Sequence, residues 1–175
     1  MILPRGEALL LPANPAFVWG TLGGAATAMI VQGQLAGPTV WLPDWLALVL
    51  AFWIVHQPRR IGVGVAFVAG LVIDVAYGSL LGQHALAYAV MGYGAVSLHR
   101  RVLWFDQRGQ VLHVLPLFAL TVGLQALVRW LAGDGAPPWA WLVSPLLTAS
   151  AWPLATRALL APQRRPPDPD ETRPL

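Results

Sequence analysis

Apolar residues run along most of this chain in six long stretches, separated by short segments that contain polar residues or proline. The stretches cover residues 16–32, 41–57, 61–80, 84–99, 110–132 and 139–160. A helix needs about 20 mostly apolar residues to cross a membrane, and short connections are typical of a compact helical bundle. The pattern predicts an all-α fold, an integral membrane bundle of six transmembrane helices over residues 1–161. Residues 162–175 are predicted to be a disordered tail, because they are rich in proline and charge.

Arginine placement predicts the orientation of the six spans. With six spans, ten arginines fall on one side of the membrane: Arg5, Arg59, Arg60, Arg100, Arg101, Arg108, Arg157, Arg164, Arg165 and Arg173. The positive-inside rule makes that side cytoplasmic, so both termini and the tail are predicted to be cytoplasmic. Only Arg129 lies near an outer end, where a long side chain can reach the membrane surface.

Tryptophans fall near the predicted ends of the spans. They are Trp41, Trp45, Trp130, Trp139 and Trp141 at outer ends, and Trp19, Trp53 and Trp104 near inner ends. Tryptophan is enriched at membrane–water interfaces, so each is predicted to be an interfacial anchor.

Composition supports the membrane class and leaves little room for catalysis. Hydrophobic residues make up 57% of the chain and charged residues 11%, against about 25% charged residues in soluble domains. Cysteine is absent, the histidines lack metal-ligand spacing, and no glycine-rich loop carries the lysine of a phosphate-binding motif. The chain lacks a basic stripe with interleaved aromatic residues, the pattern typical of a nucleic-acid-binding face, so no nucleic-acid partner is expected. We therefore expect no enzyme activity, no catalytic residue, no cofactor and no metal.

Small residues recur every fourth position in two of the spans. One stripe runs through Ala16, Gly20, Gly24 and Ala28, and the other through Gly62, Ala66, Gly70, Asp74, Gly78 and Gly82. Positions four apart share a helix face, and small residues let membrane helices approach closely. We expect both spans inside the bundle. Each stripe can either pack against another helix of this chain or receive a helix of another protein. For the third span we favour packing within the chain. For the first span the two interpretations are about equally supported.

Asp74 is the one acid deep within a predicted span, on the stripe of the third. A buried carboxylate needs a partner, and the candidates are Arg129, His84, Tyr77 and the backbone amides of the turn over residues 78–82. Two roles follow. Asp74 can be a structural pin that fixes helix packing, the role we favour, or it can be a proton or ligand site.

Residues 52–93 resemble the core of the rod shape-determining protein MreD family. The resemblance rests on an aromatic-rich end of the second span followed by Pro58-Arg59, on Gly70-Leu71 with Asp74 three residues later, on the Gly78–Gly82 turn, and on Ala85-Leu86. It covers about a quarter of the chain in detail and the remainder in layout.

This resemblance implies a non-enzymatic subunit of the bacterial inner membrane, part of the machinery that elongates the cell and guides side-wall peptidoglycan synthesis. The partners that it implies are MreC, a single-span protein with a periplasmic domain, together with MreB, RodA and a class B transpeptidase. The six-span design is also similar to the substrate-binding subunits of energy-coupling-factor transporters.

Two hypotheses follow. In the first, the stripe that contains Gly20 and Gly24, or the stripe of the third span, docks the MreC helix, while the arginine-rich loops meet anionic membrane lipid or the MreB filament. In the second, the protein is a membrane carrier or ligand-binding subunit. That hypothesis predicts an outward-facing polar cavity lined by Asp74 and by at least one of Gln83, His84 and Arg129.

Overall fold

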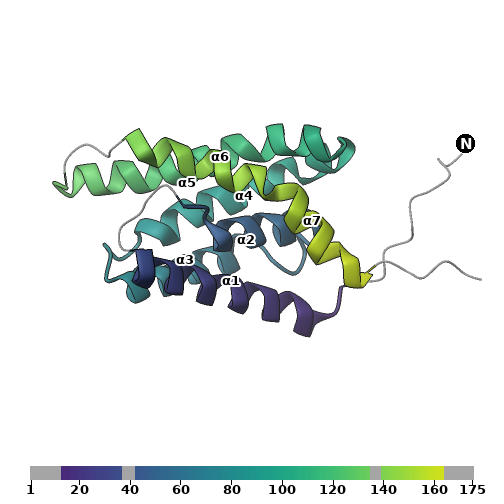
Figure 1. Ribbon diagram of the computed structural model, residues 1–175, viewed down its shortest axis with the longest axis horizontal. Helices are drawn as coiled ribbons and strands as arrows, with labels where there is room; N and C mark the ends of the chain where they lie inside the picture. Colours follow the sequence, from purple (N-terminus) through teal and green to yellow (C-terminus); the bar gives the residue numbers. More distant parts are fainter. Residues whose placement is uncertain (1–12, 37–41, 135–138, 164–175) are drawn as a thin grey trace, which may run out of the picture.

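The computed structural model describes residues 13–36, 42–134 and 139–163, and all regular structure within them is helical (Figure 1). The elements are α1 (Pro15–Ala36), α2 (Trp45–His56), α3 (Val63–Tyr77), α4 (Gln83–Trp104), α5 (Gln107–Leu131), a 3₁₀ turn η1 (Trp139–Leu142), α6 (Val143–Ser150), α7 (Trp152–Leu160) and a second 3₁₀ turn η2 (Ala161–Gln163). The predicted all-α class is confirmed for this part of the chain.

The first five helices each lie within a few residues of an expected stretch, but the sixth stretch is not one helix. It begins with η1 and is then divided into α6 and α7 at Ala151. Pro153 lies in the first turn of α7, where its missing N–H breaks no helical hydrogen bond. Most of the predicted tail, residues 164–175, lies outside the described residues.

Helix length and composition vary among the predicted spans. Judged by length and hydropathy, α5 is the one helix among the described residues that could cross a membrane, while α2 and α3 are apolar but shorter.

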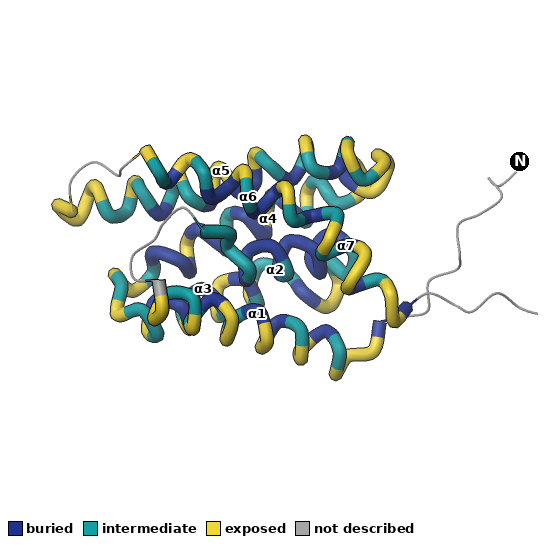
Figure 2. The backbone as a smooth tube through the Cα atoms, viewed as in Figure 1, coloured by how far each residue is buried: buried dark blue, intermediate teal, exposed yellow. Residues whose placement is uncertain are grey.

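The short helix α2 lies at the centre of the bundle. Residues 50–55 are fully buried, and Figure 2 shows this helix in dark blue among the others. A helix that is apolar on all faces is buried when other helices surround it. Helix α2 contacts α1, α4, α6 and α7. Asp44 fixes its start, since the carboxylate accepts a hydrogen bond from the Ala47 amide at 2.8 Å.

Helices α3 and α4 approach each other closely. A Cβ built on Gly70 would lie 2.5 Å from the Ala85 amide nitrogen, and a Cβ on Gly92 would lie 3.2 Å from the Cβ of Ala66. The small residues of the third span therefore pack within the chain, through Ala66, Gly70 and Asp74, which are buried. Removing side-chain bulk is what allows two backbones to come this near.

Helix α1 lies at the edge of the bundle, with its glycine stripe facing outward. It packs through Val18, Leu22, Ala25 and Met29, whereas Gly20 and Gly24 are exposed and have no atom within 4 Å of a built Cβ. The expectation that this stripe lies inside the bundle is wrong. Larger apolar side chains on the opposite face bury more area, so they take the contact with the core.

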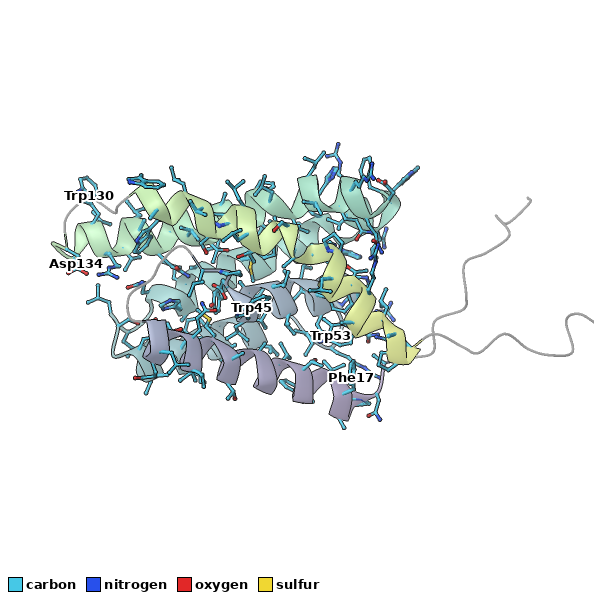
Figure 3. All side chains as sticks on the ribbon, in the orientation of Figure 1. Phe17, Trp45, Trp53, Trp130 and Asp134 are labelled. Carbon is cyan, nitrogen blue, oxygen red and sulfur yellow. The ribbon has the colours of Figure 1, made fainter. Side chains whose placement is uncertain are left out.

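The tryptophans divide between the surface and the core. Trp19, Trp104, Trp130 and Trp139 are more than half exposed, and Figure 3 shows Trp130 near the tip of α5. Trp53 is fully buried, donates its indole N–H to Thr21 Oγ at 2.9 Å and meets the Phe17 ring edge-on; both residues are labelled in Figure 3. The anchor role expected for Trp53 is therefore wrong.

The two ends of the bundle, left and right in Figure 1, differ in the charged residues that they carry. The α2–α3 and α4–α5 connections and the last turns of α7 lie at one end, which carries Arg59, Arg60, Arg100, Arg101, Arg108 and Arg157. We call it the arginine end. Among the described arginines, only Arg129 belongs to the opposite end.

Candidate functional site

Asp74 lies in the last turns of α3, at the end opposite the arginine end, and its carboxylate is surrounded by hydrogen-bond donors. Oδ1 accepts from the His84 amide at 2.9 Å, from His84 Nδ1 at 2.8 Å and from Ser79 Oγ at 3.0 Å. Oδ2 accepts from the amides of Gly82 at 2.8 Å and Ala85 at 3.3 Å. Asp74 is 1% exposed, so these donors replace the water that its carboxylate has lost.

These contacts cap the N-terminus of α4 from another helix. The first amides of a helix have no partner within it, and Gly82, at the N-cap position, has no side chain that could serve them. The turn that brings Asp74 to this position depends on Gly78 and Gly82, with φ of 59° and 102°, a region that side chains disfavour. Gly78 and Gly82 are therefore turn residues rather than part of the packed stripe, and Gly62 is the N-cap residue of α3.

Only some of the partners predicted for Asp74 contact its carboxylate in the structure. His84 and the turn amides contact it, whereas Arg129 instead pairs with Asp134, with Nε 3.0 Å from Oδ2. Tyr77 donates its hydroxyl proton to the Met29 carbonyl at 2.6 Å and meets the His84 ring edge-on.

The residues that carry the family resemblance are divided between the two ends. Pro58 and Arg59 lie in the α2–α3 connection at the arginine end, and Arg59 is exposed. Asp74 and Gly82 lie at the opposite end, and Gly70 lies between them in the α3–α4 contact. They therefore do not form one site.

A cavity of about 740 Å³ opens beside the Asp74 cluster, and we call it the polar cavity. Its walls come from α1, α3, α4, α5, η1 and α6 and from the N-cap residue of α2. Its polar lining comprises Gln32, Gln34, Asp44, Tyr77, Ser79, Gln83, His84, Gln125, Arg129, Asp134, Trp141 and Ser144. Asp74 is not part of the lining and lies behind His84.

Sequence reasoning missed several residues of this cavity. Asp44 was not among the candidate residues, yet it accepts hydrogen bonds from the Tyr88 hydroxyl at 3.0 Å and 2.8 Å. Its position directly before an apolar helix is an N-cap signature that could have identified it. Gln125 and Trp141 gave no such signal, since one lies in an apolar helix and the other was interpreted as a membrane anchor.

A second hollow, the apolar groove, lies between α1 and α3. It has a volume of about 490 Å³ and is lined by Trp19, Leu22, Gly23, Ala26, Leu46, Leu50, Gly64, Val65, Val68, Ala69 and Val72. Gly23 and Gly64 have open space where a Cβ would stand. Gly20 and Gly24 are also exposed on α1, but they are not among the residues that line this groove.

Metal chemistry has no evident place among these side chains. Within residues 13–36, 42–134 and 139–163, no group of three or more His, Asp or Glu residues is arranged to hold a metal ion.

Comparison with known proteins gives one consistent finding. A model of the rod shape-determining protein MreD family matches residues 15–135, which span α1 to α5. The chain is 34% identical over 116 residues to the rod shape-determining protein MreD of Haemophilus influenzae, an alignment that covers 58% of this chain and 72% of that protein. No solved structure matches the chain, so the similarity to energy-coupling-factor subunits stays a prediction.

Proposed function

Because this chain belongs to the rod shape-determining protein MreD family, we propose that it is a non-enzymatic, multi-pass inner-membrane subunit of the bacterial cell-elongation machinery. In this proposal it docks the transmembrane helix of MreC and so supports rod shape and side-wall peptidoglycan synthesis. MreB, RodA and a class B transpeptidase complete the assembly.

The proposed topology has six spans, with α6 and α7 together forming the sixth, and both termini in the cytoplasm. It is supported by the gathering of the described arginines at one end, as the positive-inside rule requires. It is also supported by large apolar side chains on the outer faces of the helices, among them Val68, Val72, Val75, Leu112 and Leu146, each about half exposed or more. Residues 1–161 then form the membrane domain and residues 162–175 a cytoplasmic tail.

The observation that carries the docking proposal is the apolar groove, with its open glycine positions. Among the described residues, nothing occupies the space at Gly20, Gly23, Gly24 and Gly64. In lipid, apolar surface alone does not drive helices together, and close approach over small residues provides the packing that does. A partner helix laid between α1 and α3 would find such a surface.

Leucine substitutions in the groove test this proposal. Gly23→Leu and Gly64→Leu would fill the space for the partner helix, while the open surroundings of both residues leave the fold intact. The control is Gly123→Leu on α5, also exposed and with nothing within 4 Å of its Cβ position. Size-exclusion profiles of each variant verify folding, and co-purification with MreC from membranes measures docking.

We expect Gly23→Leu and Gly64→Leu to lose most of the co-purified MreC, and Gly123→Leu to keep it. If both groove variants retained MreC at the level of the control, the docking site would not be this groove. Gly70→Leu is unsuitable for the test because Gly70 contacts the α4 backbone, so its substitution disturbs the fold.

A further inference from the structure

The polar cavity contains two buried hydrogen-bond donors that the described residues leave unused. Gln125 is 8% exposed and Trp141 6% exposed, and both line the cavity. Neither Gln125 Nε2 nor Trp141 Nε1 has a hydrogen-bond partner within the described segments. A buried donor without a partner costs about 1–3 kcal/mol, so two in one cavity indicate a missing acceptor.

A cation stands beside these donors. The Arg129 guanidinium lies over the Trp141 ring, 5.5 Å from its centroid, and its pairing with Asp134 uses only Nε among the contacts described. Asp134 lines this wall as well and pairs with Arg129. The wall therefore offers two unused neutral donors beside an ion pair, and the remaining guanidinium N–H groups of that pair can donate to a carboxylate or carbonyl oxygen.

The wall formed by α2, α3 and α4 has the opposite character. Asp44 accepts hydrogen bonds from Tyr88 and Ala47, but in the described part of the chain no Arg or His forms an ion pair with it. The rings of Tyr77 and His84 also line the cavity on this side. A carboxylate beside aromatic rings is a favourable environment for an ammonium group.

We propose that the polar cavity binds a small zwitterion, a free amino acid or short peptide. The ligand's carboxylate meets Gln125, Trp141 and Arg129, and its ammonium group meets Asp44. The volume of about 740 Å³ falls within the usual range for small-molecule sites, roughly 300–1,000 Å³. The site is separate from the apolar groove, so it stands whether or not a partner helix docks there.

The test uses the full chain in lipid nanodiscs and the dipeptide alanyl-alanine as probe, with binding measured by calorimetry. Two analogues define the chemistry: the N-acetylated dipeptide lacks the ammonium group, and the C-terminal amide lacks the carboxylate. We expect the dipeptide to bind at millimolar concentrations or below, and each analogue to bind more weakly.

Matched variants then locate the binding. Trp141→Phe and Gln125→Leu remove the unused donors without breaking any hydrogen bond described within the protein, so folding is preserved. Each is expected to weaken dipeptide binding about 3- to 10-fold, the value of one hydrogen bond. Trp139→Phe is the control, because Trp139 is 79% exposed and lies outside the cavity lining.

Two outcomes would overturn the proposal. One is the absence of dipeptide binding at millimolar concentrations, which would leave ordered water as the occupant of the cavity. The other is equal binding by Trp141→Phe, Gln125→Leu and Trp139→Phe, which would place the probe elsewhere. Gly23→Leu should leave dipeptide binding unchanged, so a failure here is distinguishable from a failure of MreC docking.

Discussion

Replacing Gly70 with alanine tests the contact that brings α3 and α4 together. The added methyl carbon would lie 2.5 Å from the Ala85 amide nitrogen and 2.6 Å from the His84 carbonyl carbon, whereas non-bonded carbon atoms prefer about 3.5–4.0 Å. The helices must therefore separate by about 1 Å. The obstructing atoms are backbone, so no side-chain rotation can make room.

The expected magnitude combines two opposing effects. Overpacking a well-packed contact costs about 1–3 kcal/mol, and alanine gains about 0.5–1 kcal/mol over glycine inside a helix. Because rigid backbone is displaced here, we expect Gly70→Ala to lower the free energy of unfolding by about 1–2 kcal/mol. The displacement also moves the start of α4 away from Asp74, which adds to the loss.

Two other glycines provide a graded comparison. Gly123 is exposed in the middle of α5 with nothing near its Cβ position, so Gly123→Ala should stabilise the protein by about 0.5–1 kcal/mol. Gly92 is intermediate, since its Cβ would meet side-chain carbons of Ala66 and Ile54 at 3.2 and 3.3 Å. The free energy of unfolding is measured by SDS titration in mixed micelles, followed by tryptophan fluorescence. If Gly70→Ala were as stable as Gly123→Ala, the close α3–α4 contact would be wrong.

Three further predictions concern the capping acid, the core and the topology. Asp74→Asn should lower the free energy of unfolding by about 2–3 kcal/mol, because the amide nitrogen presents donors to donors and a charge-assisted bond is lost; hydrogen exchange at the start of α4 should rise, and unchanged protection would contradict the cap. Trp53→Phe should cost about 1–2 kcal/mol, because Thr21 loses its bonded partner in the core; thermal unfolding measures the loss, and a neutral effect would exclude a stabilising role for this bond. In the cysteine-free chain, a membrane-impermeant maleimide added to spheroplasts should label Asp134→Cys at once and Arg108→Cys only after permeabilisation; the reverse order would invert the proposed orientation.

Some features of the Asp74 cluster could be predicted because they are local in sequence. Asp74, Ser79, Gly82, His84 and Ala85 lie within twelve positions, and a glycine turn directly follows an acid on a stripe of small residues. Short sequence separation limits the geometry that is available, so the amides of the turn were identifiable as partners. Arg129 was predicted as a partner of Asp74 from its charge alone. In the structure it lies on α5 and pairs with Asp134 instead.

The polar cavity could not be predicted in this way. Asp44 and Tyr88 are 44 positions apart, and the two unpartnered donors of the cavity come from α5 and η1. Bringing them together requires the complete arrangement of six helix ends, which no pattern along the chain encodes in one place.

Hydropathy, charge and turn chemistry act over a few neighbouring residues. The first five helices, the grouping of the arginines and the position of the acid could therefore be predicted along the chain, whereas the division of the sixth stretch into α6 and α7 could not. The roles of the two stripes of small residues depend on how the helices pack against one another. A glycine every fourth residue allows close contact with any neighbour and specifies none. In α3 the buried residues of the stripe pack against α4. In α1 the larger residues Val18, Leu22 and Met29 turn toward the core, and the glycines are left facing outward.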